Sequence, residues 1–234
     1  TVSLNAEQYY RTVCDSFREH GDPMVAQFQM AYMRNQFDYF GLKMPAWMAL
    51  TRQLHHLHGL PQGDELTRLV RLCFADDHRE IQYFAIETCQ KALPKLPAEA
   101  IDLLEEMILT QSWWDTVDWL SKLVGLHFRR YPMLIEPTVA RWMDSGEMWL
   151  QRVCLLFQLL YRDKTDAGLL FGLVRRVSGS KAFFLQKGAG WALREYSKTD
   201  AAAVRAFVEQ EILPPLTRRE ALKWLKKREA SGQK

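Results

Sequence analysis

Tryptophan and aspartate, two side chains that together could hold a cation, are concentrated in residues 112–119, Ser-Trp-Trp-Asp-Thr-Val-Asp-Trp. In a helix, Trp113 would begin the apolar stripe, while Trp114 and Asp118 would share the adjacent stripe. A carboxylate held against an indole plane suits a ligand that is cationic or becomes so, such as the oxocarbenium-like state of glycosyl transfer. We therefore take Asp118 as the leading catalytic candidate. The alternative is a surface aspartate paired with Lys122 at i+4.

Two further side chains could serve the same site. Trp191 lies beside a core stripe in residues 184–196. Gly188 and Gly190 each weaken this helix by roughly 1 kcal/mol relative to alanine, a cost that close approach of another group would explain. The alternative is a tryptophan wedged between helices. Arg152 interrupts an apolar stripe and must find an anion, either a carboxylate of this chain or a phosphate from outside.

The elements that must position these residues are helices. Prolines open helix-periodic stretches, glycines close them, and alternating runs of β-branched residues are absent. We count about twelve to fourteen helices joined by short loops. Thr217-Arg-Arg-Glu220 is expected to form a capping box at the start of the last helix. Since no linker marks a boundary, we expect one domain over residues 1–234.

The helices also repeat. Segments with Gln or Thr at their third place start at Glu80, Trp114, Trp149 and Phe184, which are 34, 35 and 35 residues apart. Tetratricopeptide repeats share this spacing, but their Trp-x-x-Leu-Gly-x-x-Tyr pattern is missing. The pattern therefore predicts an all-α fold, a superhelical solenoid of HEAT-like helix-pair repeats with a concave face.

The repeat provides an internal control for two candidates. At the position of Asp118 the sister helices carry an aromatic, an apolar and a glycine residue, namely Phe84, Val153 and Gly188. At the position of Trp191 they carry Glu87, Ser121 and Leu156. Neither candidate belongs to the pattern of the scaffold, which favours a local specialisation.

Positive charge is concentrated in the second half of the chain. Residues 1–110 hold 10 Lys and Arg against 15 Asp and Glu, a net charge of −5, whereas residues 111–234 hold 21 against 13, a net charge of +8. A basic half in a nearly neutral protein indicates a polyanion contact, which here would make the concave face basic. An ordinary solvated surface is the alternative.

Other classes of site lack their signatures. The histidines at 55–58 have no carboxylate or cysteine at ligand spacing, so we expect no metal, and no cofactor-binding glycine motif is present. No segment approaches the roughly 18 charge-free apolar residues of a membrane span. Four scattered cysteines without a CxxC motif predict reduced, buried thiols in a cytoplasmic protein.

Nearly the whole chain resembles the AlkD-type DNA alkylation repair glycosylases, which are HEAT-like-repeat enzymes. The resemblance is carried by five strings: Tyr32-Met-Arg-Asn35, Ser112-Trp-Trp-Asp-Thr-Val-Asp118, Trp149-Leu-Gln-Arg152, Phe184-Leu-Gln-Lys187 and Gly190-Trp-Ala-Leu-Arg-Glu-Tyr196. One departure is Gly188-Ala189, where a bulkier and better helix-forming pair is expected.

The resemblance implies removal of cationic N3- and N7-alkylated purines, such as 3-methyladenine and 7-methylguanine, from duplex DNA, without extrusion of the base into a pocket. Carried over by motif, Asp118 is the catalytic carboxylate, flanked by Trp114 and Trp191. Arg152 would contact the DNA backbone near the lesion, and Tyr32 would lie close to the damaged nucleotide. Further DNA contacts are expected within the same strings, from Trp113, Lys187 and Arg194.

No motif places a lysine as a Schiff-base nucleophile, so we expect a monofunctional hydrolase that leaves an abasic site. It would act as a monomer and without a cofactor. The alternative is a non-catalytic helical-repeat scaffold that binds DNA or a protein partner through its concave face; the filled Asp118 position argues against it.

Overall fold

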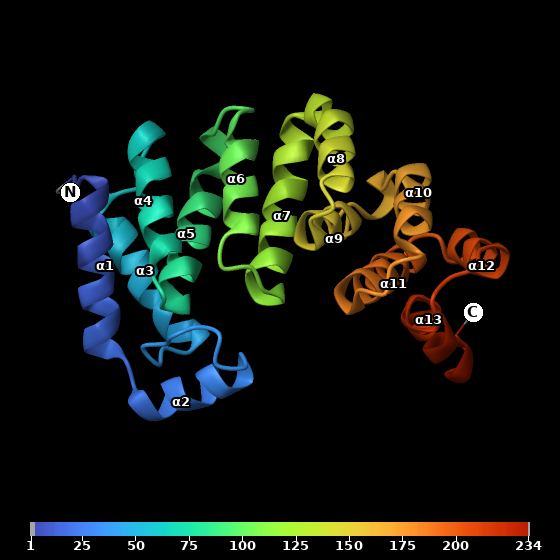
Figure 1. The fold of residues 1–234 in the computed structure, drawn as a ribbon, viewed down its shortest axis with the longest axis horizontal. Coiled ribbons are helices and arrows are strands. Elements are labelled where there is room, and N and C mark those ends of the chain that lie inside the picture. Colours follow the sequence, from blue (N-terminus) through green and yellow to red (C-terminus); the bar gives the residue numbers. More distant parts are fainter. Residues whose placement is uncertain (1–2, 234) are drawn as a thin grey trace. The chain divides into compact units, whose positions relative to one another are not determined.

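The protein is described by a computed structural model covering residues 3–233. Its secondary structure over these residues consists of thirteen α-helices and three short 3₁₀ helices, with no β-strand (Figure 1). The all-α class and the expected number of helices are therefore confirmed. The chain forms two compact units, which divide between Gln111 and Ser112. That they act as one domain over residues 1–234 stays a prediction.

From residue 3 onward, the first unit contains six α-helices. Helix α1 packs against α3, α4 and α5, and α4 packs against α5, whereas α2 runs at a steep angle to these helices (Figure 1). The bounds are α1 Ala6–His20, α2 Pro23–Tyr32, α3 Met44–His58, α4 Gly63–Ala75, α5 Arg79–Ala92, η1 Leu93–Lys95 and α6 Ala100–Leu109.

The second unit, described up to residue 233, contains the other seven α-helices. Within it α9 packs between α7 and α11, and α11 packs in turn against α13. The bounds are α7 Trp114–Arg130, η2 Pro132–Leu134, α8 Ile135–Asp144, α9 Met148–Leu156, η3 Arg162–Lys164, α10 Ala167–Val177, α11 Phe183–Ser197, α12 Ala201–Gln210 and α13 Pro215–Ala230.

The helix-pair repeat is present in the structure. Helices α5, α7, α9 and α11 begin at residues 79, 114, 148 and 183, with one further α-helix between each of them and the next. The recurring glutamine has a structural role, because its Nε2 donates to a backbone oxygen just before its own helix. The bonds are Gln82 to Asp76 (2.9 Å), Gln151 to Met143 (3.0 Å) and Gln186 to Ser180 (2.9 Å). The superhelical course and a concave basic face stay predictions.

Buried polar groups brace the first unit. The carboxylate of Glu80 accepts hydrogen bonds from the backbone N–H groups of Phe40, Gly41 and Leu42, at 2.9–3.0 Å, and so ties α5 to the loop between α2 and α3. Gly41 is required there, because its φ is +94°. Since every oxygen of this buried carboxylate has a partner, Glu80 is a structural residue.

The cysteines are free thiols and are buried, as predicted: Cys14, Cys73, Cys89 and Cys154. Burial raises the pKa of the Cys14 thiol to about 11 and that of the Cys89 and Cys154 thiols to about 12. These thiols therefore stay protonated and pack as small apolar groups.

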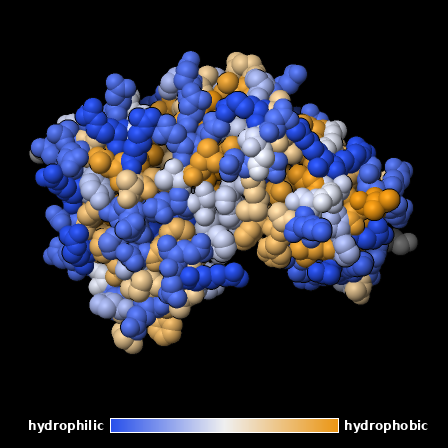
Figure 2. Space-filling model, in the orientation of Figure 1, coloured by the Kyte–Doolittle hydropathy of each residue, from blue (hydrophilic) through white to orange (hydrophobic). Residues whose placement is uncertain are grey.

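One face of the molecule can be judged for its polarity from Figure 2. On the face drawn in Figure 2, hydrophilic residues predominate and hydrophobic ones show in separate small groups. Over residues 3–233, no helix combines the length and the apolar character needed to cross a membrane.

Candidate functional site

Helix α7 places Asp118 at the edge of the core. Val117, Leu120 and Val124 are fully buried and form the apolar stripe of this helix. Asp118 lies on the adjacent stripe, and its side chain keeps 18% of its surface exposed. In the sister helices, Phe84 and Val153 are fully buried at the same position. Asp118 thus occupies a core-edge position that the repeat otherwise fills with apolar residues or, at Gly188, with glycine.

The expected place of Trp113 in this stripe is wrong. Trp113 precedes the helix as its N-cap, with extended φ and ψ of −156° and 167°. Its ring instead makes edge-to-face contacts with Trp149 (centroids 6.0 Å apart) and Phe184 (5.2 Å). Trp113 is therefore part of an aromatic cluster at the N-terminal ends of α7, α9 and α11.

Asp118 is paired, but with Arg152 of α9 instead of Lys122. Arg152 Nε donates to Asp118 Oδ1 at 2.8 Å, and Nη2 donates to Oδ2 at 3.0 Å. Nη1 donates to the backbone oxygen of Phe184 at 2.6 Å. Only 5% of the Arg152 side chain is exposed. Of the two anions considered for Arg152, the structure contains the carboxylate of this chain, held in the planar two-point geometry that guanidinium favours.

Trp191 and Gly188 border the same guanidinium. The Trp191 ring centroid lies 6.0 Å from Arg152 Cζ, within reach of a cation–π interaction. A methyl group at Gly188 would lie 3.0 Å from Arg152 Nη1. The glycine therefore leaves room for the close approach of Arg152 to α11, which agrees with the explanation expected for its cost to helix stability. Helices α7, α9 and α11 together bring Asp118, Arg152 and Trp191 to one place.

Lys187 and Arg194, expected to contact DNA, are both paired with Glu220 of α13. Lys187 Nζ lies 3.1 Å from Oε1, and Arg194 Nη1 lies 3.0 Å from Oε2. Burial acts to raise the pKa of the Glu220 carboxyl, but the surrounding cations Lys187, Lys223 and Arg194 outweigh it and hold the pKa below its ordinary value. The two cations are thus engaged within the protein.

The capping box expected at Thr217 and Glu220 is wrong. Pro214 is the N-cap and Pro215 the first residue of α13, so the helix begins earlier than expected. Thr217 and Glu220 therefore lie inside the helix and face α11, where Thr217 Oγ1 donates to the Gln186 oxygen at 2.9 Å.

The remaining expected site residues, Tyr32 and Trp114, lie at helix ends. Tyr32 is the last residue of α2 in the first unit, and the residue is 73% exposed. Trp114 is the first residue of α7 and is partly buried. A contact of either residue with DNA stays a prediction.

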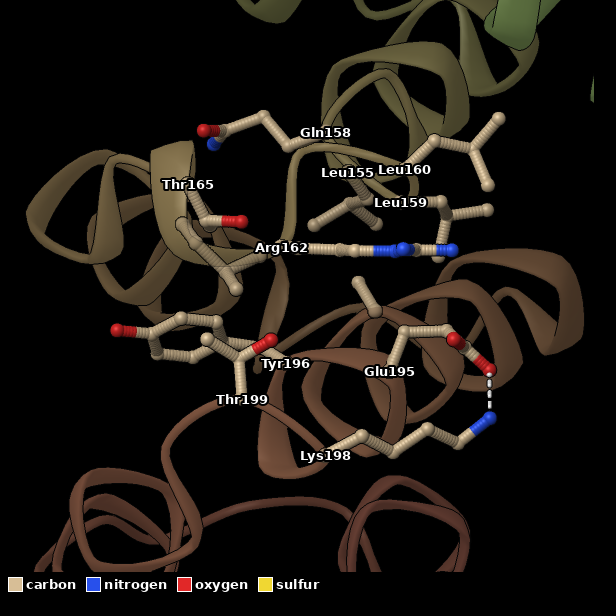
Figure 3. A pocket seen from close by; sticks show the side chains of 12 residues that line it. Leu155, Gln158, Leu159, Leu160, Arg162, Thr165, Glu195, Tyr196, Lys198 and Thr199 are labelled. Carbon is tan, nitrogen blue, oxygen red and sulfur yellow. Dashed lines mark hydrogen bonds and ion pairs between the residues drawn. The ribbon is translucent and has the colours of Figure 1, made fainter.

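A separate pocket lies at the other end of α9 and α11, with a volume of about 370 Å³. Figure 3 shows the Arg162 side chain crossing it, between leucines that follow α9 and the end of α11, where Glu195 and Lys198 form an ion pair (2.7 Å). Asp118, Arg152 and Trp191 do not line this pocket.

Sequence reasoning missed three participants. The Phe184 backbone oxygen fixes Arg152, Glu220 holds Lys187 and Arg194, and Trp149 joins the aromatic cluster. The only available signal for the first was Arg152 itself, because a guanidinium that interrupts a buried apolar stripe needs a hydrogen-bond acceptor. The pairing of Glu220 had no local signal, since its partners lie 26 and 33 residues earlier in the chain.

Comparison with known proteins bears on the family and the fold of the chain. Residues 13–225 match the model of a protein family described as DNA alkylation repair enzyme. A solved structure described as a predicted DNA alkylation repair enzyme from Enterococcus faecalis is 29% identical, with a TM-score of 0.83 over 88% of this chain and 97% of that one. AlkD2 from Streptococcus mutans shares the fold at 14% identity, with a TM-score of 0.59 over 77% of this chain and 89% of that one. No protein with a curated description matches the chain.

Proposed function

Because the chain belongs to the family of DNA alkylation repair enzymes, we propose that it is a DNA glycosylase acting on cationic N3- and N7-alkylated purines in duplex DNA. The observation that carries this proposal is the carboxylate of Asp118, fixed by Arg152 yet partly accessible. A fixed and accessible negative charge is what stabilises a developing sugar cation.

The chemistry needs little more than this charge. In 3-methyladenine and 7-methylguanine nucleotides the base already carries positive charge, so it leaves as a neutral molecule when the glycosidic electron pair moves onto it. The protein must then stabilise the cationic sugar and direct water to C1′. Asp118 stabilises the cation and accepts the proton of the attacking water, which leaves an abasic site. The indole faces of Trp114 and Trp191 support the deoxyribose and its growing charge.

Arg152 has two parts in this proposal. Its bonds to Asp118 and to the Phe184 oxygen hold the carboxylate in one orientation before DNA binds. Nη1 and Nη2 each retain an N–H group beyond these bonds, which can donate to a phosphate beside the lesion. A contact to the DNA backbone therefore needs no bond of the ion pair to break, but it has to be made through the 5% of the side chain that is exposed.

The DNA contacts follow from the same resemblance and from charge. The excess of basic residues lies in the second half of the chain, and Tyr32, Trp113, Lys187 and Arg194 are proposed to touch the duplex. Recognition rests on the charge of the leaving base. The protein is proposed to act as a monomer and as a monofunctional hydrolase.

Release of free base is the test of this function. Duplexes that carry one 7-methylguanine are expected to lose that base in a single-turnover assay with excess protein. Matched duplexes with uracil or hypoxanthine, which are neutral, are expected to stay intact. Absence of base release from the alkylated duplex, together with binding to it, would favour the non-catalytic scaffold. Efficient uracil release would overturn selection by leaving-group charge.

A further inference from the structure

The contact between α11 and α13 is unusually close at one residue. A methyl group at Gly190 would lie 2.6 Å from Glu220 Cβ and 2.9 Å from the Thr217 backbone oxygen. Both distances are shorter than any real contact of a methyl group. Residue 190 must therefore be glycine for α13 to lie at its present distance from α11. This close packing offsets the helix stability that the glycine costs.

Glu220 ties the two helices together beside this contact. Lys187, Trp191 and Arg194 stand at i, i+4 and i+7 on one stripe of α11. The two oxygens of Glu220 take the cations on either side of the tryptophan, one each, and only 8% of this glutamate side chain is exposed. A single carboxylate therefore holds both ends of the segment that carries Trp191 at its centre.

The N-terminal half of α11 also contacts Arg152. Gly188 leaves the space for Nη1, and the oxygen of Phe184 accepts its hydrogen bond. Any shift of α11 away from α9 would lengthen these contacts and change the direction of the guanidinium. Because Arg152 holds Asp118 at two points, the carboxylate would turn with it.

We propose that Glu220 is a positioning residue of the glycosylase site, which fixes Asp118 through α11 and Arg152 and weakens the contacts of Lys187 and Arg194 with phosphate. The inference rests on the proposed function. It means that the two cations, which share a stripe with Trp191, do not supply DNA affinity at full strength. Their ion pairs with Glu220 hold the catalytic geometry instead.

Opposite effects on rate and binding follow from this arrangement. Loss of the Glu220 charge releases two cations toward DNA, so affinity for undamaged duplex rises. The slope of log K against log salt concentration steepens by about 0.9 for each phosphate that is newly neutralised. The rate of base release falls on the order of tenfold or more, because a small displacement of catalytic groups is costly. A residue that only stabilised the fold would lower the rate and leave the salt slope unchanged.

The test compares Glu220→Gln with Glu229→Gln, a control on the same helix whose glutamate forms an exposed ion pair with Arg205. Three quantities are measured on each protein: single-turnover release of 7-methylguanine, duplex affinity over a salt series, and melting temperature. Glu220→Gln is expected to release base slowly and to bind undamaged duplex more tightly with a steeper slope. The control is expected to match the wild type in rate.

Two results would overturn the inference. One is a Glu220→Gln variant with the rate and salt slope of the wild type. The other is a slower variant with a lower melting temperature and an unchanged slope. If Glu220→Gln does not fold, Glu220→Asp replaces it: the shorter carboxylate can reach one cation only, so a slope steeper by about one unit is expected, and an unchanged rate and slope would overturn the inference. Wild-type protein that releases no base refutes the proposed function itself.

Discussion

Asp118 and Arg152 stand 34 residues apart and face each other across α7 and α9, with both carboxylate oxygens bonded to the guanidinium at 2.8 and 3.0 Å. The pair joins the residue proposed to stabilise the sugar cation to the residue proposed to touch the DNA backbone. A substitution of either residue therefore also affects the other. Asp118 and Arg152 can still be tested one at a time, each with its partner unchanged.

Asp118→Asn is expected to abolish nearly all base release while DNA binding survives. The amide keeps the size of the side chain and removes the fixed charge, which should cost roughly 3–4 kcal/mol of transition-state stabilisation, or about 10²–10³ in rate. Single-turnover release and duplex affinity measure the two effects. Lys122→Ala, which removes the exposed cation at i+4, is the control and should match the wild type. A rate for Asp118→Asn close to that of the wild type would remove Asp118 from the mechanism.

Arg152→Ala is expected to affect stability as well as binding. It leaves Asp118 without its partner at the edge of the core, which should lower the free energy of unfolding by about 3 kcal/mol. If Arg152 also touches a phosphate, damaged and undamaged duplexes lose affinity by similar factors, and the slope of log K against log salt concentration flattens by about one unit.

Melting temperature and salt slope on one preparation separate these roles of Arg152. An unchanged salt slope with a lower melting temperature would show that Arg152 does not contact a phosphate and serves only in the ion pair with Asp118. The exposed Arg162 at the pocket of Figure 3 provides a control, because Arg162→Ala removes the same charge from the same unit of the chain.

Three glycine-to-alanine substitutions in helices are expected to change the free energy of unfolding in different directions. Gly172 of α10 has open space where a methyl group would go, so Gly172→Ala should stabilise the protein by about 1 kcal/mol. Gly188→Ala gains the same helix propensity but presses on Arg152, so base release should fall while stability changes little. Gly190→Ala meets the backbone of α13 and should destabilise by about 2 kcal/mol. Denaturant unfolding and base release are measured on all three variants. Equal free energies of unfolding for the three would contradict the prediction.

His55 is expected to make stability depend on pH. Burial, and then the charge of Lys91, lower the pKa of His55 to about 4 from its ordinary 6.5, and its Nε2 lies 2.9 Å from Thr88 Oγ1. Between these two values the unfolded chain binds a proton that the folded chain does not. Stability from this source is therefore full above pH 6.5 and falls as the pH drops toward 4. As the pH is lowered from 7.5 to 4.5, the melting temperature should fall less steeply for His55→Gln than for the wild type. The exposed neighbour supplies the control, His56→Gln, and identical slopes for all three proteins would contradict the prediction.

Much of the architecture is determined locally, and so the sequence predicts it. The apolar stripe of α7, the thirteen helices and the spacing of the repeat follow from a periodicity that each helix carries within itself. The buried thiols follow from the same apolar patterns. The motif around Asp118 also singles out this residue, because the sister helices place apolar side chains or glycine there.

The partners of the site residues were decided by tertiary structure. Lys122 was the only cation that helical geometry could offer to Asp118, whereas Arg152 comes from α9 and makes two bonds to the carboxylate with its own side chain almost fully buried. The capping box failed for a related reason: Pro214 and Pro215 started α13 early, and Thr217 and Glu220 were then free to meet α11. Periodicity assigns each side chain a face of its own helix, but only the packing of helices against one another decides which charges meet.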